Sequence, residues 1–231
     1  MSGNVTTITS SGGPVLSRDV PVDPARTAML VIDVQNYCCH PDGAEFAGLD
    51  EAARREQYGY YFDRLDKTVY PNIRRLQDAV RAGGGEVTFT VIESLTQDGR
   101  DRGLDYKITG FNVPKGSWDA QVIDAIVPVG DEIVIPKTAS SVFNATNIEY
   151  VLRNLGVEYL IICGTVTDQC VDTAVRDACD KGFLVTLVGD CCAAYSQQRH
   201  DTSMELNKGY CRQVTTDQLI AEFPLVERAA G

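Results

Sequence analysis

The sequence has few histidines, a deficit of basic residues and no long apolar run. Its 231 residues include only two histidines, His40 and His200, which excludes a His-rich metal site, and we expect neither a metal nor a cofactor. Lys and Arg total 21 against 32 Asp and Glu, a formal charge of −11, which argues against nucleic acid and anionic membrane surfaces as partners. No segment approaches the roughly 18 to 20 apolar residues of a membrane span.

The N-terminus lacks the basic region and the apolar core of a secretory signal. Residues 1–20 are therefore expected to form a flexible leader and residues 21–231 a single domain, in a cytoplasmic protein. The eight cysteines include two adjacent pairs, Cys38–Cys39 and Cys191–Cys192, which suit a disulfide framework poorly and lack the C-x-x-C spacing of redox or metal sites. We expect free thiols, and the question becomes which of them is reactive.

Short β-branched runs alternate with amphipathic segments. Strands are predicted at residues 28–34, 86–92, 132–136, 157–164 and 183–189, with a weaker run at 212–215. Helices are predicted at residues 62–80, after the capping-box pair Thr146 and Glu149, at about 168–181 and at about 197–208. Such alternation specifies a right-handed, doubly wound, parallel α/β sheet.

Two stretches depart from the alternation. Residues 36–61, which include an insertion at about 44–62, and residues 94–118 lack clear periodicity and follow the first and second strands. Long irregular loops are usually functional, and open α/β sheets bind ligands at the carboxyl ends of their strands. We expect the ligand site between these loops.

Cys170 has the setting of a nucleophile. The segment CGTVTDQC, residues 163–170, leaves a buried strand through Gly164 and places Cys170 in the first turn of the next helix. There the helix dipole and unpaired backbone N–H groups favour a thiolate and an oxyanion. The alternative for any cysteine is a small buried hydrophobe, which suffices for the others.

Two charged residues close two of the other buried strands. Asp33 follows the run 29–32 and Lys137 follows the run 133–136. Either alone is explained by a strand emerging into solvent, but an acid, a lysine and a cysteine at one sheet edge form a coherent set. Lys137 would favour an ionised Asp33 and a Cys170 thiolate, and Asp33 would shuttle the proton.

Three segments carry a family resemblance: LVIDVQN around Asp33, VIPKTASSVF around Lys137 and CGTVTDQCVDTAVRDA around Cys170. They resemble the signatures of the isochorismatase-like cysteine hydrolases, a group containing nicotinamidase, N-carbamoylsarcosine amidase and ureidoacrylate amidohydrolase. The resemblance runs from about residue 26 to 220. It implies a six-stranded, mainly parallel sheet with helices on both faces, and a dimer or tetramer.

The resemblance also implies a mechanism. An Asp-Lys-Cys triad would hydrolyse a C–N bond of a small molecule through a thioester. A cis peptide at Thr165–Val166 would let the Val166 and Cys170 N–H groups form the oxyanion hole. Because Cys170 is present, the resemblance favours an amidase over the isochorismate-cleaving branch.

The resemblance restricts the substrate class less closely than it restricts the reaction. Residues 115–128 resemble ureidoacrylate amidohydrolases, which implies a linear N-carbamoyl or ureido substrate. Hydrolysis of nicotinamide, maleamate or a peptide-like amide remains an alternative, as does a non-catalytic binding relative. Fast iodoacetamide labelling of Cys170 relative to the other seven cysteines would separate enzyme from binding protein.

Four further residues are candidates for substrate contact. Asn36 and Tyr37 follow Asp33 in an ordinary polar loop. Glu93 ends the second strand and equally serves as its cap, while Trp118 has the alternative role of anchoring a helix entry. His40 is treated as a solvated loop residue.

Overall fold

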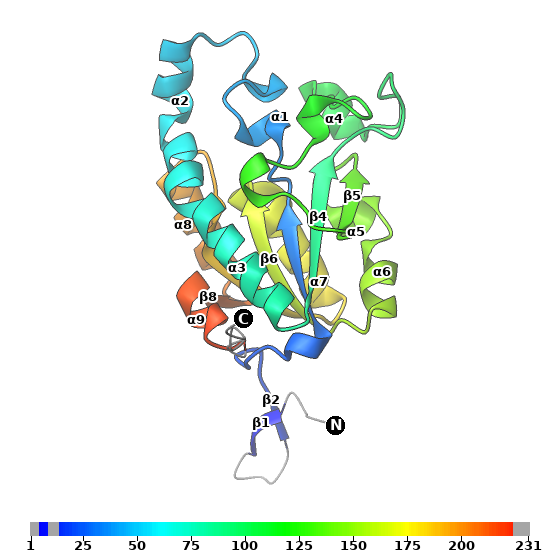
Figure 1. Ribbon diagram of the computed structural model, residues 1–231, viewed down its shortest axis with the longest axis vertical. Helices are drawn as coiled ribbons and strands as arrows, with labels where there is room; N and C mark the ends of the chain where they lie inside the picture. The colour runs from blue at the N-terminus through cyan, green and yellow to red at the C-terminus, as the bar shows by residue number, and fades with distance from the viewer. Residues whose placement is uncertain (1–4, 9–13, 224–231) are drawn as a thin grey trace, which may run out of the picture.

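Six parallel strands form the central sheet of the computed structural model, which describes residues 5–8 and 14–223 (Figure 1). The strands are β3 (Thr27–Ile32), β4 (Glu86–Ile92), β5 (Ile133–Lys137), β6 (Tyr159–Thr165), β7 (Leu184–Ala193) and β8 (Arg212–Val214). Their order is β5-β4-β3-β6-β7-β8. The six predicted strands and the doubly wound α/β fold are confirmed.

The two central strands bring the candidate site to one edge. All six residues of β3 and all seven of β6 are buried, as expected of strands covered on both faces. Ile32 at the end of β3 pairs with Thr90 of β4 and with Gly164 of β6. In the same direction Ile92 of β4 pairs with Lys137 of β5. The carboxyl ends of four strands therefore lie together, below α1 and α4 in Figure 1.

Helices cover both faces of the sheet (Figure 1). On one face α3 (Tyr70–Ala82) packs with α9 (Thr216–Ile220), and its buried stripe contains Ile73, Leu76 and Val80. On the other face α7 (Asp172–Asp180) packs with α5 (Val142–Ala145). Helix α6 (Ile148–Asn154) contacts α5, and helix α8 (Gln197–Asn207) contacts α7.

The insertion at residues 44–62 is mostly helical, so the prediction of an irregular loop there is wrong. Asp50 caps α2 (Glu51–Arg64) by accepting from the Ala53 N–H, and α2 continues through the π-helical turn η3 (Leu65–Val69) into α3. Pro71 sits in the first turn of α3 without ending the helix. Tyr61 and Leu65 are fully buried, so packing against the core stabilises a segment whose exposed face is highly polar.

The predicted capping box at Thr146 is also wrong. Asn147 is the N-cap of α6, and the Ile148 N–H donates to Thr146 Oγ1 at 3.1 Å. Glu149 turns outward to Lys181, at 2.7 Å. Between β4 and β5 the chain is largely irregular, as predicted, except for the short helix α4 (Leu104–Thr109).

Of the expected leader, residues 1–4 and 9–13 lie outside the described residues, as do residues 224–231 of the expected domain. The strands β1 (Val5–Ile8) and β2 (Pro14–Leu16) form an antiparallel pair, which the sequence did not predict. Among the residues that the structure describes, no helix is both long enough and apolar enough to span a membrane.

Candidate active site

Asp33 leaves β3 in an unusual backbone conformation. Its φ of 53° makes it the one non-glycine residue with positive φ among those described. Its backbone oxygen accepts hydrogen bonds from the Gln35 N–H, Thr165 Oγ1 and Cys38 Sγ at 3.0, 3.1 and 3.1 Å. Its Oδ1 accepts from Thr90 Oγ1 at 2.8 Å. The left-handed conformation costs about 1–2 kcal/mol in general, and these contacts hold it in place.

Lys137 ends β5 beside Asp33. Its Nζ lies 2.7 Å from Asp33 Oδ2 and donates to the Ala139 carbonyl at 3.0 Å. The side chains of Lys137 and Asp33 are 0% and 2% exposed, so the pair is fully buried. The register of β3, β4 and β5 brings these two residues together although 104 positions separate them in the sequence.

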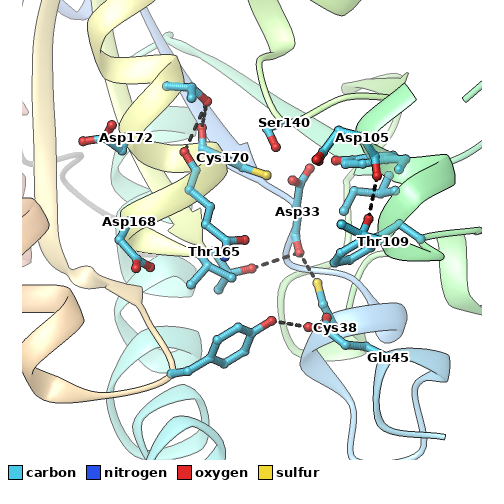
Figure 2. A pocket seen from close by; sticks show the side chains of 17 residues that line it. Asp33, Cys38, Glu45, Asp105, Thr109, Ser140, Thr165, Asp168, Cys170 and Asp172 are labelled. Atoms are coloured by element: carbon cyan, nitrogen blue, oxygen red, sulfur yellow. Dashed lines mark hydrogen bonds between the residues drawn. The ribbon is translucent and has the colours of Figure 1, made fainter. Parts of the chain in front are cut away.

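Cys170 completes the set from the opposite side. It lies in η6 (Thr167–Val171), the π-helical turn that leads from β6 into α7. Lys137 Nζ is 3.4 Å from its Sγ, and Figure 2 shows the thiol and the Asp33 carboxylate pointing toward one another. The ammonium group of Lys137 therefore contacts both the acid and the thiol.

The resting protonation states differ from the expectation of a free thiolate. Burial raises the pKa of Cys170 to about 12; Lys137 opposes this rise and the charge of Asp33 adds to it. Burial lowers the pKa of Lys137, but the charge of Asp33, together with that of Cys170 once it is ionised, outweighs burial and raises that pKa overall. The site thus pairs a neutral thiol with an ammonium group, and the thiol must lose its proton during attack.

The loop before Cys170 is tightly held. The Thr165–Val166 peptide bond is cis. Gly164 has φ of 121°, and a Cβ there would lie 2.2 Å from the Ile32 backbone oxygen, so only glycine fits between β6 and β3. The hydroxyl oxygen of Thr165 also lies 3.5 Å from the sulfur of Cys39.

Helix α8 supports the same loop from outside. Ser203 Oγ donates to the Thr167 carbonyl at 3.0 Å, and His200 Nδ1 lies 3.0 Å from Thr167 Oγ1. His200 Nε2 lies 3.1 Å from the Arg64 guanidinium, which can only donate, so the ring is a neutral imidazole with its proton on Nδ1. Burial and Arg64 lower the pKa of His200 to about 4.

A cavity of about 340 Å³ opens over the Cys170 thiol (Figure 2). Its size suits a small organic molecule. Its lining comes from the segments that follow β3, β5 and β7, from β4 and the α4 region, and from the Cys170 loop with the start of α7: Asp33, Cys38, Glu45, Ile92, Asp105, Tyr106, Thr109, Phe111, Ser140, Thr165, Val166, Asp168, Gln169, Cys170, Asp172, Thr173 and Tyr195.

The four residues named as candidates for substrate contact do not line this cavity. Asn36 is buried, and its Nδ2 donates to the Trp118 carbonyl at 3.0 Å. Tyr37 packs its ring on Phe111, and Glu93 accepts from the Gly116 N–H at 2.7 Å. Trp118 is 46% exposed and meets His40 edge-on at 5.0 Å. Asn36 and Tyr37 lie in α1 (Asn36–Cys39), which begins directly after Gln35. Their side chains contact the segment between β4 and β5, whereas Cys38 of the same helix lines the cavity.

Sequence reasoning missed Glu45 and Tyr195. Glu45, in the single turn η2 (Ala44–Phe46), accepts a hydrogen bond from the Tyr195 hydroxyl across 150 positions of sequence. Burial raises the pKa of Glu45 to about 7, and the bond from Tyr195 opposes the rise. No spacing or periodicity marks either residue.

The eight cysteines are free thiols. In the part of the chain that the structure describes, no group of three or more His, Cys, Asp or Glu residues is placed to hold a metal ion.

Comparison with known proteins finds relatives that are similar to this chain in sequence. Ureidoacrylate amidohydrolase RutB of Rhizobium rhizogenes is 28% identical over 202 residues, which cover 77% of this chain and 74% of the relative. N-carbamoylsarcosine amidase of Arthrobacter sp. is 37% identical over 122 residues, 51% of this chain and 46% of that protein.

Among solved structures, a cysteine hydrolase from Pseudomonas syringae pv. phaseolicola superposes with a TM-score of 0.74 at 24% identity, covering 96% of this chain and 98% of that one. The isochorismatase domain model matches residues 27–218, which span β3 to α9 and include Asp33, Lys137 and Cys170. The chain therefore belongs to the isochorismatase family.

Proposed function

We propose that this chain is a cysteine-dependent amidohydrolase that cleaves a C–N amide or ureide bond of a small molecule through a thioester. The observation that carries the proposal is the position of Lys137 Nζ, 2.7 Å from Asp33 Oδ2 and 3.4 Å from Cys170 Sγ beneath a cavity of about 340 Å³. The amidohydrolase names of the two curated relatives support the reaction class.

The first half of the reaction forms the thioester. Asp33 takes the proton of the Cys170 thiol as sulfur attacks the carbonyl carbon, which avoids a free thiolate whose formation the raised pKa of Cys170 opposes. The Val166 and Cys170 N–H groups hold the oxyanion. Asp33 then delivers the proton to the leaving nitrogen, the C–N bond breaks, and ammonia or an amine departs.

The second half returns the enzyme to its resting state. Asp33 removes a proton from water, whose oxygen attacks the thioester carbonyl. The C–S bond breaks, Asp33 returns the proton taken from water to the sulfur, and an acid is released, which is a carbamate when the substrate is a ureide. Throughout, Lys137 balances the negative charge that passes between Asp33 and the sulfur.

The test compares Cys170→Ala with the wild type. We expect ammonia release from a panel of amides and ureides to be abolished, while the far-UV spectrum and the urea midpoint stay close to wild type. Cys163→Ala is the matched control, because Cys163 is also buried but lies within β6 and does not line the cavity. Near wild-type turnover by Cys170→Ala would refute the mechanism.

The free cysteines suit a reducing compartment and support the further proposal of a cytoplasmic protein. The family resemblance supports a homodimer or homotetramer. Light scattering of the purified chain measures the subunit number directly. A monomer at micromolar concentration would contradict the proposed oligomer and leave the proposed reaction mechanism unaffected.

A further inference from the structure

The lining of the Cys170 cavity has acidic side chains and no basic one. Five of its residues are acids: Asp33, Glu45, Asp105, Asp168 and Asp172. None of the lining residues that the structure describes is Lys, Arg or His. A carboxylate on a substrate would meet like charge here, in a partly desolvated space where repulsion is stronger than in water.

Three of these acids are already paired with a cation. The pairs are Asp33 with Lys137 at 2.7 Å, Asp168 with Arg199 at 2.6 Å and Asp172 with Arg176 at 2.9 Å. Glu45 and Asp105 form no ion pair within residues 14–223. The unbalanced negative charge of the cavity therefore resides on Asp105 and, above its pKa of about 7, on Glu45.

The hydroxyl groups of the lining do not offset this charge, because most of their protons are engaged. Thr109 donates to the Asp105 carbonyl at 2.9 Å and Thr165 to the Asp33 carbonyl at 3.1 Å. Thr173 donates to the Cys170 carbonyl at 3.0 Å, and Tyr195 donates to Glu45. Four of the six hydroxyl groups of the lining thus direct their protons to other acceptors.

Three carboxylate oxygens of the lining are buried without a hydrogen-bond partner: Asp33 Oδ2, which is ion-paired with Lys137, Glu45 Oε2 and Asp168 Oδ1. Such an oxygen is costly unless a donor reaches it. Asp168 already has Arg199 on its other oxygen, whereas Glu45 has only the neutral Tyr195 hydroxyl. Of the two acids without an ion pair, Glu45 is therefore the one with a buried oxygen that no donor reaches.

We propose that the substrate carries a cationic nitrogen, such as a primary ammonium group, at the end remote from the scissile carbonyl, and that this group pairs with Glu45. The inference rests on the proposed function and specifies its substrate class as an aminoalkyl ureide or amide. It sets this chain apart from the activity in the name of its relative RutB, because ureidoacrylate bears a carboxylate.

Charged thiol reagents test the cavity without requiring turnover. Three methanethiosulfonates with 2-aminoethyl, ethyl and 2-sulfonatoethyl groups each transfer their thioalkyl group to a thiol and release methanesulfinate. Mass spectrometry measures the modification rates at Cys170 and at half-buried Cys179, which serves as internal reference. We expect the aminoethyl-to-sulfonatoethyl rate ratio at Cys170 to exceed that at Cys179 by tenfold or more.

Variants assign the preference to one carboxylate. Glu45→Gln should lower the ratio at Cys170 about tenfold. Glu86→Gln, at the exposed first residue of β4 and the opposite end of the strand from the site, removes the same overall charge and should leave the ratio unchanged. A ratio at Cys170 equal to that at Cys179, a preference for the anionic reagent, or an unchanged ratio in Glu45→Gln would overturn the inference.

Matched ureas connect the charge preference to catalysis. We expect kcat/KM to fall in the order 4-aminobutylurea, n-butylurea, 4-ureidobutyrate. Hydrolysis with 4-ureidobutyrate preferred would refute the cationic substrate and leave the proposed function standing. Failure of Cys170 to react with all three reagents, together with absence of turnover, would instead refute the proposed function.

Discussion

Replacing Lys137 with methionine removes the cation from a fully buried pair. The Lys137 and Asp33 side chains are 0% and 2% exposed and 2.7 Å apart, so the variant leaves a carboxylate in the core with Thr90 as its remaining side-chain donor. Removing one partner of a buried ion pair costs about 3–5 kcal/mol. Methionine approximates the volume of lysine, so little of this cost comes from a cavity.

A double-mutant cycle isolates the charge. Asp33→Asn alone leaves the Lys137 ammonium group buried without a counter-charge, and we expect a loss of unfolding free energy of similar size. Asparagine tolerates the positive φ at this position, so the backbone is retained. In the double variant neither charge remains, and its loss should fall below the sum of the single losses by about 1–3 kcal/mol.

Urea unfolding followed by circular dichroism at pH 7 measures the four free energies of unfolding, with a constant m-value as the check on two-state behaviour. Hydrolysis assays on the same samples should find all three variants inactive, including the double variant that regains stability. Strict additivity, or a loss below about 1 kcal/mol for Lys137→Met, would refute the account of Lys137 as the essential counter-charge.

The titration of two buried groups supplies the remaining predictions. Because burial raises the pKa of Cys170 to about 12, iodoacetamide labelling of this thiol should rise about tenfold per unit between pH 7 and 10; a plateau below pH 9 would contradict the neutral resting thiol, and Lys137→Met should slow labelling at every pH. Burial lowers the pKa of His200 to about 4 from an ordinary value of 6.5. The unfolded chain therefore binds the extra proton, and stability should fall as pH drops from about 6.5 to 4. His200→Gln should reduce the slope of unfolding free energy against pH by the equivalent of about one bound proton. An unaltered slope would exclude His200 as the cause.

Much of the architecture follows from local sequence. Continuous β-branched runs are stable only as strands buried on both faces, and their alternation with amphipathic segments leads to a parallel sheet. Since parallel strands end at one edge, Asp33 after β3 and Lys137 at the end of β5 were expected as neighbours, and the structure has their charged atoms 2.7 Å apart. The helix that begins at Cys170 was predicted for the same local reasons.

Tertiary packing decided the rest. Residues 51–64 lack a strong apolar stripe, and they form α2 because Tyr61 and its neighbours are buried against the core. Glu45 and Tyr195 meet across the cavity, although no pattern in either segment predicts the other. The pKa of Cys170 depends on how completely its surroundings exclude water, a sum over segments distant in sequence. The sequence by itself determined the strands and the edge where the acid, lysine and thiol gather, because those depend on local periodicity; the shape and charge of the cavity above them arise from long-range contacts that only the folded chain creates.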